Sequence, residues 1–166
     1  GIVLDGTPEQ QARYLPRLVT GELIGSFALT EPDSGSDAAS LRTTAIRDGD
    51  HYVLNGAKRY ITNAPEAGIF TVMARTDLTN KGADGISAFI VERNTPGLSL
   101  GSPDHKMGHK GSHTCDVMFD DCRVPAANLI GGCEGVGFKT AMKVLDKGRI
   151  NIAAISVGVA ERMLAD

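Results

Sequence analysis

No block of like charge occurs in the 166 residues, whose 17 basic and 20 acidic side chains leave a net charge of −3. Neither nucleic acid nor an anionic membrane is therefore expected as a partner. No apolar run reaches the length of a membrane-spanning helix, and the first residues lack the charged-then-apolar pattern of a secretory signal. These absences predict a soluble, intracellular protein without a membrane span.

Cysteine is scarce and unpaired in pattern: Cys115, Cys122 and Cys133 are an odd number and form no CxxC motif. Free thiols in a reducing compartment are therefore expected. Internal repeats and low-complexity segments are also missing, and the moderate charge and 42% apolar content indicate one compact domain. Gly1 leads directly into helix-like sequence, and residues 150–166 are still amphipathic at the last position, so we expect a piece of a longer protein.

Short apolar runs dominate the middle of the chain. Thr7, Pro8 and Gln10 have the residue types that begin a helix, which we expect to break at Pro16 and end near Gly21. Turn residues, including Asp48-Gly49, then separate six runs rich in β-branched and aromatic residues. These predicted strands are 24–29, 41–47, 51–55, 69–75, 86–92 and 114–119. Without helices between them, they favour an antiparallel barrel or sandwich over a nucleotide-binding α/β sheet. Residues 86–91 are apolar on both faces, so we expect cover on both sides, part of it from outside this chain.

A long helix is predicted after the turn at 131–137. The apolar residues that carry its four-then-three spacing, typical of a helix in a bundle, are Phe138, Met142, Leu145, Ile152, Val159 and Met163. Arg149 and Ser156 share this face. A guanidinium on an apolar face needs an anion, so Arg149 either pairs with Asp146 or a neighbouring carboxylate, or lies beside a ligand pocket.

Two patterns suggest other kinds of site. His105, His109 and His113 recur every four residues with Cys115 nearby, which is typical of metal ligands. Gly108 and Gly111 would break the helix that such a site needs, so we predict loop histidines and no metal. The glycines of 131–138 resemble a phosphate-binding loop, but no buried parallel strand and crossover helix precede them, so a helix lead-in is favoured.

The most informative segment is LTEPDSGSD at 29–37, directly after an apolar run. Such a turn presents backbone N–H groups and hydroxyls to a polar or anionic ligand, although a cluster of this kind, taken alone, is more often a plain turn. It is followed by GAKRYITNA at 56–64, KMGHKGS at 106–112 and LDKGRINIA at 145–153. In this order, and over nearly the whole chain, these motifs resemble the acyl-CoA dehydrogenase family of flavoenzymes.

The resemblance implies a mainly β fold with flanking helices. Residues 1–23 would end an N-terminal helical domain, 24–130 would form the antiparallel β-barrel or sandwich of the middle domain, and 131–166 would begin the C-terminal helical bundle. The implied cofactor is FAD.

The resemblance also implies two flavin-binding segments. Thr30 would bond the pyrimidine edge of the ring, and Ser36 would lie where flavin and substrate CoA meet. Thr62 would donate to the hydride-accepting nitrogen, and Tyr60 would stack near the ring, where many relatives have Trp. The full implied cofactor set is Phe27, Ala28, Leu29, Thr30, Ser36, Tyr60, Ile61 and Thr62. Fixed donors suit a ring that gains negative charge on reduction. Ser36, Asp146 and Arg149 would contact the CoA thioester.

Family chemistry needs a carboxylate base, which in one branch precedes the Arg of the long helix; here that position is Gly148. We therefore expect the base to lie outside this chain, the chain to contain no catalytic residue, and the chain alone to be inert. The segments 119–125 and 148–153 look most like short-chain or branched short-chain members. His109 and Lys110 depart from the commoner apolar-then-Arg pattern in their loop.

Relatives also imply the surroundings of the enzyme. An acyl-CoA substrate, an electron-transfer flavoprotein as acceptor and a homotetramer or dimer are expected. The location would be the cytoplasm in a bacterium or the mitochondrial matrix in a eukaryote. An acyl-CoA oxidase that uses oxygen, or a non-catalytic binding fragment, is the alternative.

Overall fold

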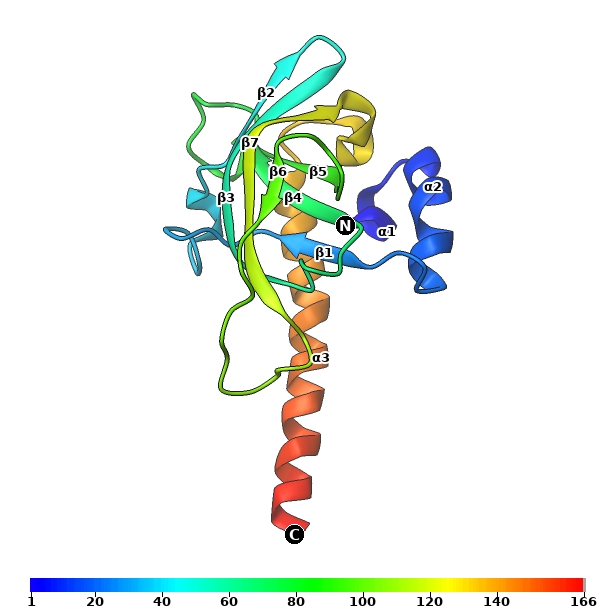
Figure 1. Ribbon diagram of the computed structural model, residues 1–166, viewed down its shortest axis with the longest axis vertical. Helices are drawn as coiled ribbons and strands as arrows, with labels where there is room; N and C mark the ends of the chain where they lie inside the picture. The colour runs from blue at the N-terminus through cyan, green and yellow to red at the C-terminus, as the bar shows by residue number, and fades with distance from the viewer. Residues whose placement is uncertain (166) are drawn as a thin grey trace.

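Seven strands form one curved sheet in the computed structural model, which describes residues 1–165 (Figure 1). Their order is β1-β4-β2-β3-β7-β6, with β5 paired to the other side of β4. The bounds are β1 Gly25–Ala28, β2 Thr44–Asp48, β3 His51–Thr62, β4 Ile69–Arg75, β5 Ile86–Glu92, β6 Leu98–Leu100 and β7 Thr114–Pro125. This half-barrel with flanking helices confirms the predicted fold class. Most pairs are antiparallel, but β1 runs parallel to β4, and β2 meets β4 in parallel at one position.

All six predicted runs contain a strand, but several bounds differ. The runs at 51–55 and 114–119 are the first parts of the 12-residue strands β3 and β7, which pair with each other along most of their length. The run at 41–47 begins too early, because a 3-10 turn at Ala38–Ser40 precedes β2. The three-residue β6, which pairs only with β7, was missed.

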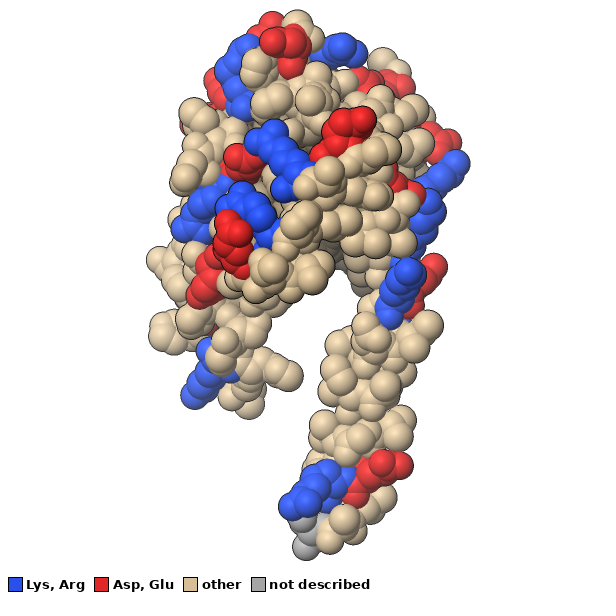
Figure 2. Space-filling view, turned by 90° about the vertical axis from the view of Figure 1, so that its right-hand side faces the viewer, with Lys and Arg blue, Asp and Glu red and all other residues tan. Residues whose placement is uncertain are grey.

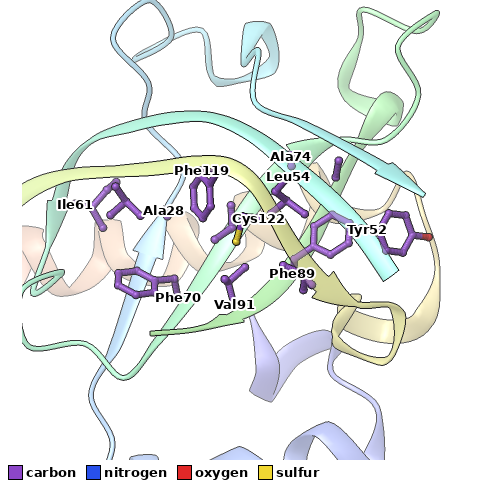
Figure 3. Packing of buried hydrophobic residues seen from close by; sticks show 14 of the residues in the cluster. Ala28, Tyr52, Leu54, Ile61, Phe70, Ala74, Phe89, Val91, Phe119 and Cys122 are labelled. Carbon is purple, nitrogen blue, oxygen red and sulfur yellow. The ribbon is translucent and has the colours of Figure 1, made fainter. Parts of the chain in front are cut away.

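Two apolar clusters occupy the two faces of the central strands. Figure 3 shows the first, in which side chains of β3 and β7 meet those of β4 and β5, with Tyr52 edge-on to Phe89 at 4.9 Å between ring centroids. The second cluster takes the alternate residues of the same strands, such as Met73 and Ile90, and packs them against the helices. Both faces of β5 are thus covered within this chain. The expectation that part of this cover comes from elsewhere was wrong for β5.

Two short helices, α1 (Ile2–Asp5) and α2 (Pro8–Val19), lie on one side of the sheet (Figure 1). The capping box predicted at Thr7 is present, because Thr7 and Gln10 exchange side-chain-to-backbone hydrogen bonds. The predicted break at Pro16 is wrong, since α2 continues through it. Pro16 removes one N–H on the exposed side of the helix, where water can satisfy the carbonyl of Ala12, while the buried Tyr14 holds the opposite face.

The long helix α3 (Gly137–Ala165) packs on β5 only at its beginning. Its inner residues Phe138, Met142 and Leu145 join the second apolar cluster. The rest of the helix projects from the body, and Figure 2 shows an open hollow between this projection and the sheet. Apolar side chains on this half are 53–89% exposed: Ile150, Ile152, Ile155, Val157, Val159, Met163 and Leu164.

Gly137 sets how closely α3 approaches the sheet. A Cβ at this position would lie 2.3 Å from the Ser87 carbonyl carbon and 2.5 Å from the Ala88 nitrogen, both of them backbone atoms of β5. We expect Gly137→Ala to lower the free energy of unfolding by about 1–3 kcal/mol, because the helix must shift outward. Gly158→Ala is the matched control, since nothing lies within 4 Å of a Cβ there. Urea unfolding checks this pair, and equal stability of the two variants would contradict the close approach.

All three cysteines are free; Cys115 and Cys122 are buried and Cys133 is exposed. Within residues 1–165, no helix has both the length and the apolar character needed to cross a bilayer.

Candidate functional site

The structure brings the two donor-bearing segments of the sequence side by side. Residues 26–30 leave β1 next to the end of β3, where the Ser26 hydroxyl donates to the Thr62 carbonyl. At the other end of this contact, the Arg59 amide donates to the Thr30 carbonyl over 2.8 Å. These two hydrogen bonds hold residues 26–30 beside residues 59–62.

A groove of about 420 Å³ lies between the first of these segments and α3. Its wall on the sheet side includes Thr30 and Ser36, and its wall on the helix side includes Leu145 and Arg149. Its remaining lining residues are Leu29, Gly35, Asp37, Ala38, Ala39, Phe138 and Met142. Three residues predicted from distant parts of the sequence, Thr30, Ser36 and Arg149, therefore share one groove. Its size is within the range of sites for small ligands, and its lining combines apolar side chains with hydroxyl and charged groups.

The hydroxyls of Thr30, Ser36 and Thr62 are free to serve a ligand. Ser36 and Thr62 are exposed and Thr30 is half-buried, and none of the three hydroxyls bonds to another group within residues 1–165. A hydroxyl offers one donor and two acceptor positions. Free hydroxyls can bind the polar edge of a planar ring, so the residues present fit a flavin.

Tyr60 projects from an irregular point of β3. The register with β7 shifts between Lys58 and Ile61, and Tyr60 has φ of 58° there, a conformation that a bulky residue rarely adopts. Its ring is 62% exposed. The Arg59 guanidinium lies over the ring, 4.4 Å from its centroid, and is itself held by Asp116 at 2.7 Å and Asp104 at 3.0 Å. The bulge thus directs an aromatic ring outward, and Arg59 fixes its orientation.

The predicted residues divide into exposed side chains and core. Ala28 and Ile61 are buried in the first apolar cluster, so only their backbone atoms could reach a ligand. Phe27 packs partly against the second cluster. Asp146 lies 2.6 Å from Arg149 in an exposed ion pair, so the pairing considered for Arg149 exists alongside its position on the groove wall.

Sequence reasoning missed a buried ion pair beneath the groove. Lys58 on β3 is fully buried, and its Nζ lies 2.7 Å from Glu31 Oε1 and 3.2 Å from the Leu29 carbonyl. The Glu31 carboxylate also accepts hydrogen bonds from the amides of Arg42 at 2.6 Å and Thr43 at 3.0 Å. The available signal was a Lys at an inward-facing strand position, since Lys58 continues the two-residue alternation of the buried Tyr52 and Leu54, but the predicted strand stopped at residue 55.

Burial and the ion pair have opposite effects on the pKa of each of these two residues. Burial raises the pKa of Glu31, but Lys58 and the hydrogen bonds from Arg42 and Thr43 outweigh it and hold this pKa below its ordinary value of 4.5. Burial lowers the pKa of Lys58 to about 8, although Glu31 acts against this change. Both groups are therefore charged at pH 7.

The lowered pKa of Glu31 predicts a loss of stability in acid. Because the unfolded chain takes up this proton at a higher pH than the folded one, the contribution of Glu31 is complete above pH 4.5 and is lost as the pH falls through the folded value. Between about pH 5 and pH 3, the free energy of unfolding should fall more steeply in wild type than in Glu31→Gln. Urea unfolding across this range measures both slopes, with Asp48→Asn, from an exposed pair, as control. Parallel slopes for wild type and Glu31→Gln would contradict the assignment.

The structure also shows where the spaced histidines and the glycine-rich segment 131–138 lie. His113 lies 2.6 Å from Glu66, and the histidine-bearing loop lines a separate pocket of about 540 Å³. Within residues 1–165, no group of three or more His, Cys, Asp or Glu side chains comes together to hold a metal. Two of the glycines around the start of α3 lie close to neighbouring backbone: the Gly135 amide donates to Ser87 Oγ at 2.9 Å, and a Cβ at Gly137 would lie 2.3 Å from a backbone atom of β5. These contacts hold the start of α3 on the sheet.

Comparison with known proteins gives a consistent result. Residues 26–122 match the family model described as acyl-CoA dehydrogenase, middle domain. The chain is 52% identical over 158 residues to acryloyl-CoA reductase (NADH) of Anaerotignum propionicum, covering 94% of this chain and 40% of that protein. It is 51% identical over 159 residues to mitochondrial isobutyryl-CoA dehydrogenase of Dictyostelium discoideum, and this match covers 96% of this chain and 38% of that protein.

The solved structure of butyryl-CoA dehydrogenase from Megasphaera elsdenii superposes with a TM-score of 0.91 at 46% identity. The match covers 96% of this chain and 42% of that one. The chain therefore spans about two-fifths of the length of these relatives.

Proposed function

This chain belongs to the acyl-CoA dehydrogenase family, and on that premise we propose that the protein containing it oxidises a short acyl-CoA thioester to the trans-2-enoyl-CoA with FAD. The observation that carries this proposal is the convergence of Thr30, Ser36 and Arg149 on one groove. Thr62 lies at the end of β3 that Ser26 of the neighbouring β1 contacts. The relatives' much greater length supports a division in which 1–23 ends a helical domain, 24–130 is the middle domain and 131–166 begins a bundle.

The residues of this chain would bind and orient rather than react. The segments Phe27–Ser36 and Tyr60–Thr62 would hold the flavin ring, with Thr30 and Thr62 donating hydrogen bonds to it and Tyr60 stacking near it. Bound FAD would supply the hydride acceptor for the β carbon of the substrate. Ser36, Asp146 and Arg149 would guide the thioester along the groove, where Arg149 offers the positive charge that CoA phosphates or a polarised carbonyl would use.

Removal of the α proton needs a carboxylate base, and the only carboxylate among the residues that line the groove belongs to the exposed Asp37, which lies in a loop. Gly148 stands where one branch of the family has its Glu, and Asp146 is already paired with Arg149. We propose that the base comes from the part of the protein that the relatives possess and this chain does not span. The exposed apolar face of α3 after Arg149 is suited to contact further helices of the same bundle.

The proposed acyl chain length, electron acceptor, oligomeric state and cellular location depend on the same family resemblance. Relatives named for acryloyl, isobutyryl and butyryl groups support a short substrate. We further propose an electron-transfer flavoprotein as acceptor, a homotetramer or dimer, and residence in the bacterial cytoplasm or the mitochondrial matrix. An acyl-CoA oxidase is the second candidate within the family. The relative named as an NADH-dependent reductase favours a third, in which the same site runs toward the saturated thioester.

Anaerobic titration tests the proposed reaction. The natural polypeptide that contains this chain should carry a flavin absorbance, and butyryl-CoA should bleach it in the absence of oxygen. Oxygen consumption during turnover would then identify an oxidase, and NADH-dependent reduction of the flavin would identify a reductase. A flavin that no acyl-CoA of any chain length bleaches would refute the dehydrogenase.

A further inference from the structure

Glu31, within the segment that the proposed function assigns to flavin, forms a buried ion pair with Lys58 of β3. We propose that these two residues are positioning residues that hold 29–36 in the conformation that receives the flavin ring. Neither is among the residues that line the groove, so their side chains act on the ligand only through the conformation of this segment. This inference depends on the proposed function but gives these two side chains a role that the proposal does not.

Glu31 connects three separate parts of the chain. Its carboxylate binds Lys58 of β3 and the amides of Arg42 and Thr43, which follow the segment and lead into β2. Its backbone N–H and carbonyl pair with those of Ser34 over 2.9 and 3.2 Å, closing the turn. A single side chain thereby fixes the middle of the segment, its exit and the neighbouring strand relative to one another.

Lys58 fixes the entrance of the segment. Its ammonium donates to the Leu29 carbonyl, one residue before Thr30, while the Arg59 amide donates to the Thr30 carbonyl. An ammonium offers several donors at one point, so it can satisfy the carbonyl and the carboxylate together. An apolar side chain of the same length could fill this space but would leave the Leu29 carbonyl without that donor.

The hydrogen bonds of the segment explain which of its groups remain free. Ser34 is buried and donates to the Asp37 carbonyl at 2.7 Å, so this hydroxyl serves the turn itself. The hydroxyls of Thr30 and Ser36 make no such bond within the described residues and lie on the groove wall. The backbone and the buried side chains of the segment are therefore used in hydrogen bonds that hold its shape, and the hydroxyls of Thr30 and Ser36 are left for a ligand.

The decisive variant keeps the fold but removes both charges. Glu31→Gln, Lys58→Met and the double variant are made in the natural polypeptide that contains this chain, with Arg123→Met, from an exposed ion pair, as control. FAD affinity is measured by quenching of flavin fluorescence, and the visible circular dichroism of bound flavin reports how the ring is held. Replacement of a buried pair by uncharged groups often leaves stability unchanged, so the double variant separates positioning from folding.

We expect the double variant to unfold as wild type does, yet to bind FAD about tenfold or more weakly with an altered visible dichroism. Arg123→Met should change neither. A folded double variant with wild-type affinity and dichroism would overturn the positioning role. If the double variant does not fold, the same measurements are made on Glu31→Gln at a temperature where that single variant is folded. Weaker FAD binding with altered dichroism would support the positioning role, and wild-type affinity and dichroism would overturn it. Failure of wild type itself to bind FAD would refute the proposed function as well.

Discussion

Thr62→Val should slow the anaerobic reduction of bound flavin by butyryl-CoA by about 100-fold, the typical effect of removing one fixed donor from a site where negative charge develops. Thr62 is exposed, its hydroxyl makes no hydrogen bond within residues 1–165, and its carbonyl accepts one from Ser26. Valine keeps the shape and the backbone contact and removes only the hydroxyl, so the flavin should still bind.

Stopped-flow absorbance measures this rate directly. Thr95→Val is the matched control, since Thr95 lies in the turn between β5 and β6, away from the groove. Its rate and flavin content should equal those of wild type. A Thr62→Val protein that is reduced as fast as Thr95→Val would show that this hydroxyl does not stabilise the reduced ring.

Lys58→Met should lower the free energy of unfolding by about 3–5 kcal/mol, because it leaves the Glu31 carboxylate buried without its cation. Glu31 is 6% exposed, so water cannot replace the missing charge. Adding Glu31→Gln to this variant should restore most of the loss, since no unpaired charge then remains. Urea unfolding of both single variants and the double variant at pH 7 completes the cycle.

An exposed pair calibrates this result. Arg123 and Asp48 are 52% and 59% exposed, and pairs of this kind contribute about 0–1 kcal/mol. A cost for Lys58→Met no larger than that for Arg123→Met would mean that the buried pair is not the anchor that its contacts indicate.

Local patterns predicted most of the secondary structure because local physics determines it. The Thr7 capping box, the turn glycines and the apolar spacing of α3 each depend on neighbours a few residues away. The break at Pro16 failed because tertiary burial of Tyr14 outweighs one lost hydrogen bond. The parallel pairing of β1 with β4 joins strands 44 positions apart in sequence, as the Gly25–Ile69 partners show, and no local pattern encodes it.

The candidate site could be predicted from the sequence only through the family resemblance. Thr30, Ser36 and Arg149 came from the family resemblance, and the structure brings them together. Lys58 and Glu31 escaped notice because each is an ordinary charged residue in sequence, and only the fold shows that both are buried against each other. The predicted strand ended at residue 55, so it left out Lys58, although Lys58 is buried in the same two-residue alternation of β3 as Tyr52 and Leu54.

A crystal structure of the natural polypeptide with FAD tests the central claim most directly. The isoalloxazine ring should lie against Thr30, Tyr60 and Thr62, with Ser36 and Arg149 on the groove wall beside it. Lys58 and Glu31 should remain paired. Flavin bound at another surface, with the hydroxyls of Thr30 and Thr62 still facing solvent, would contradict this account.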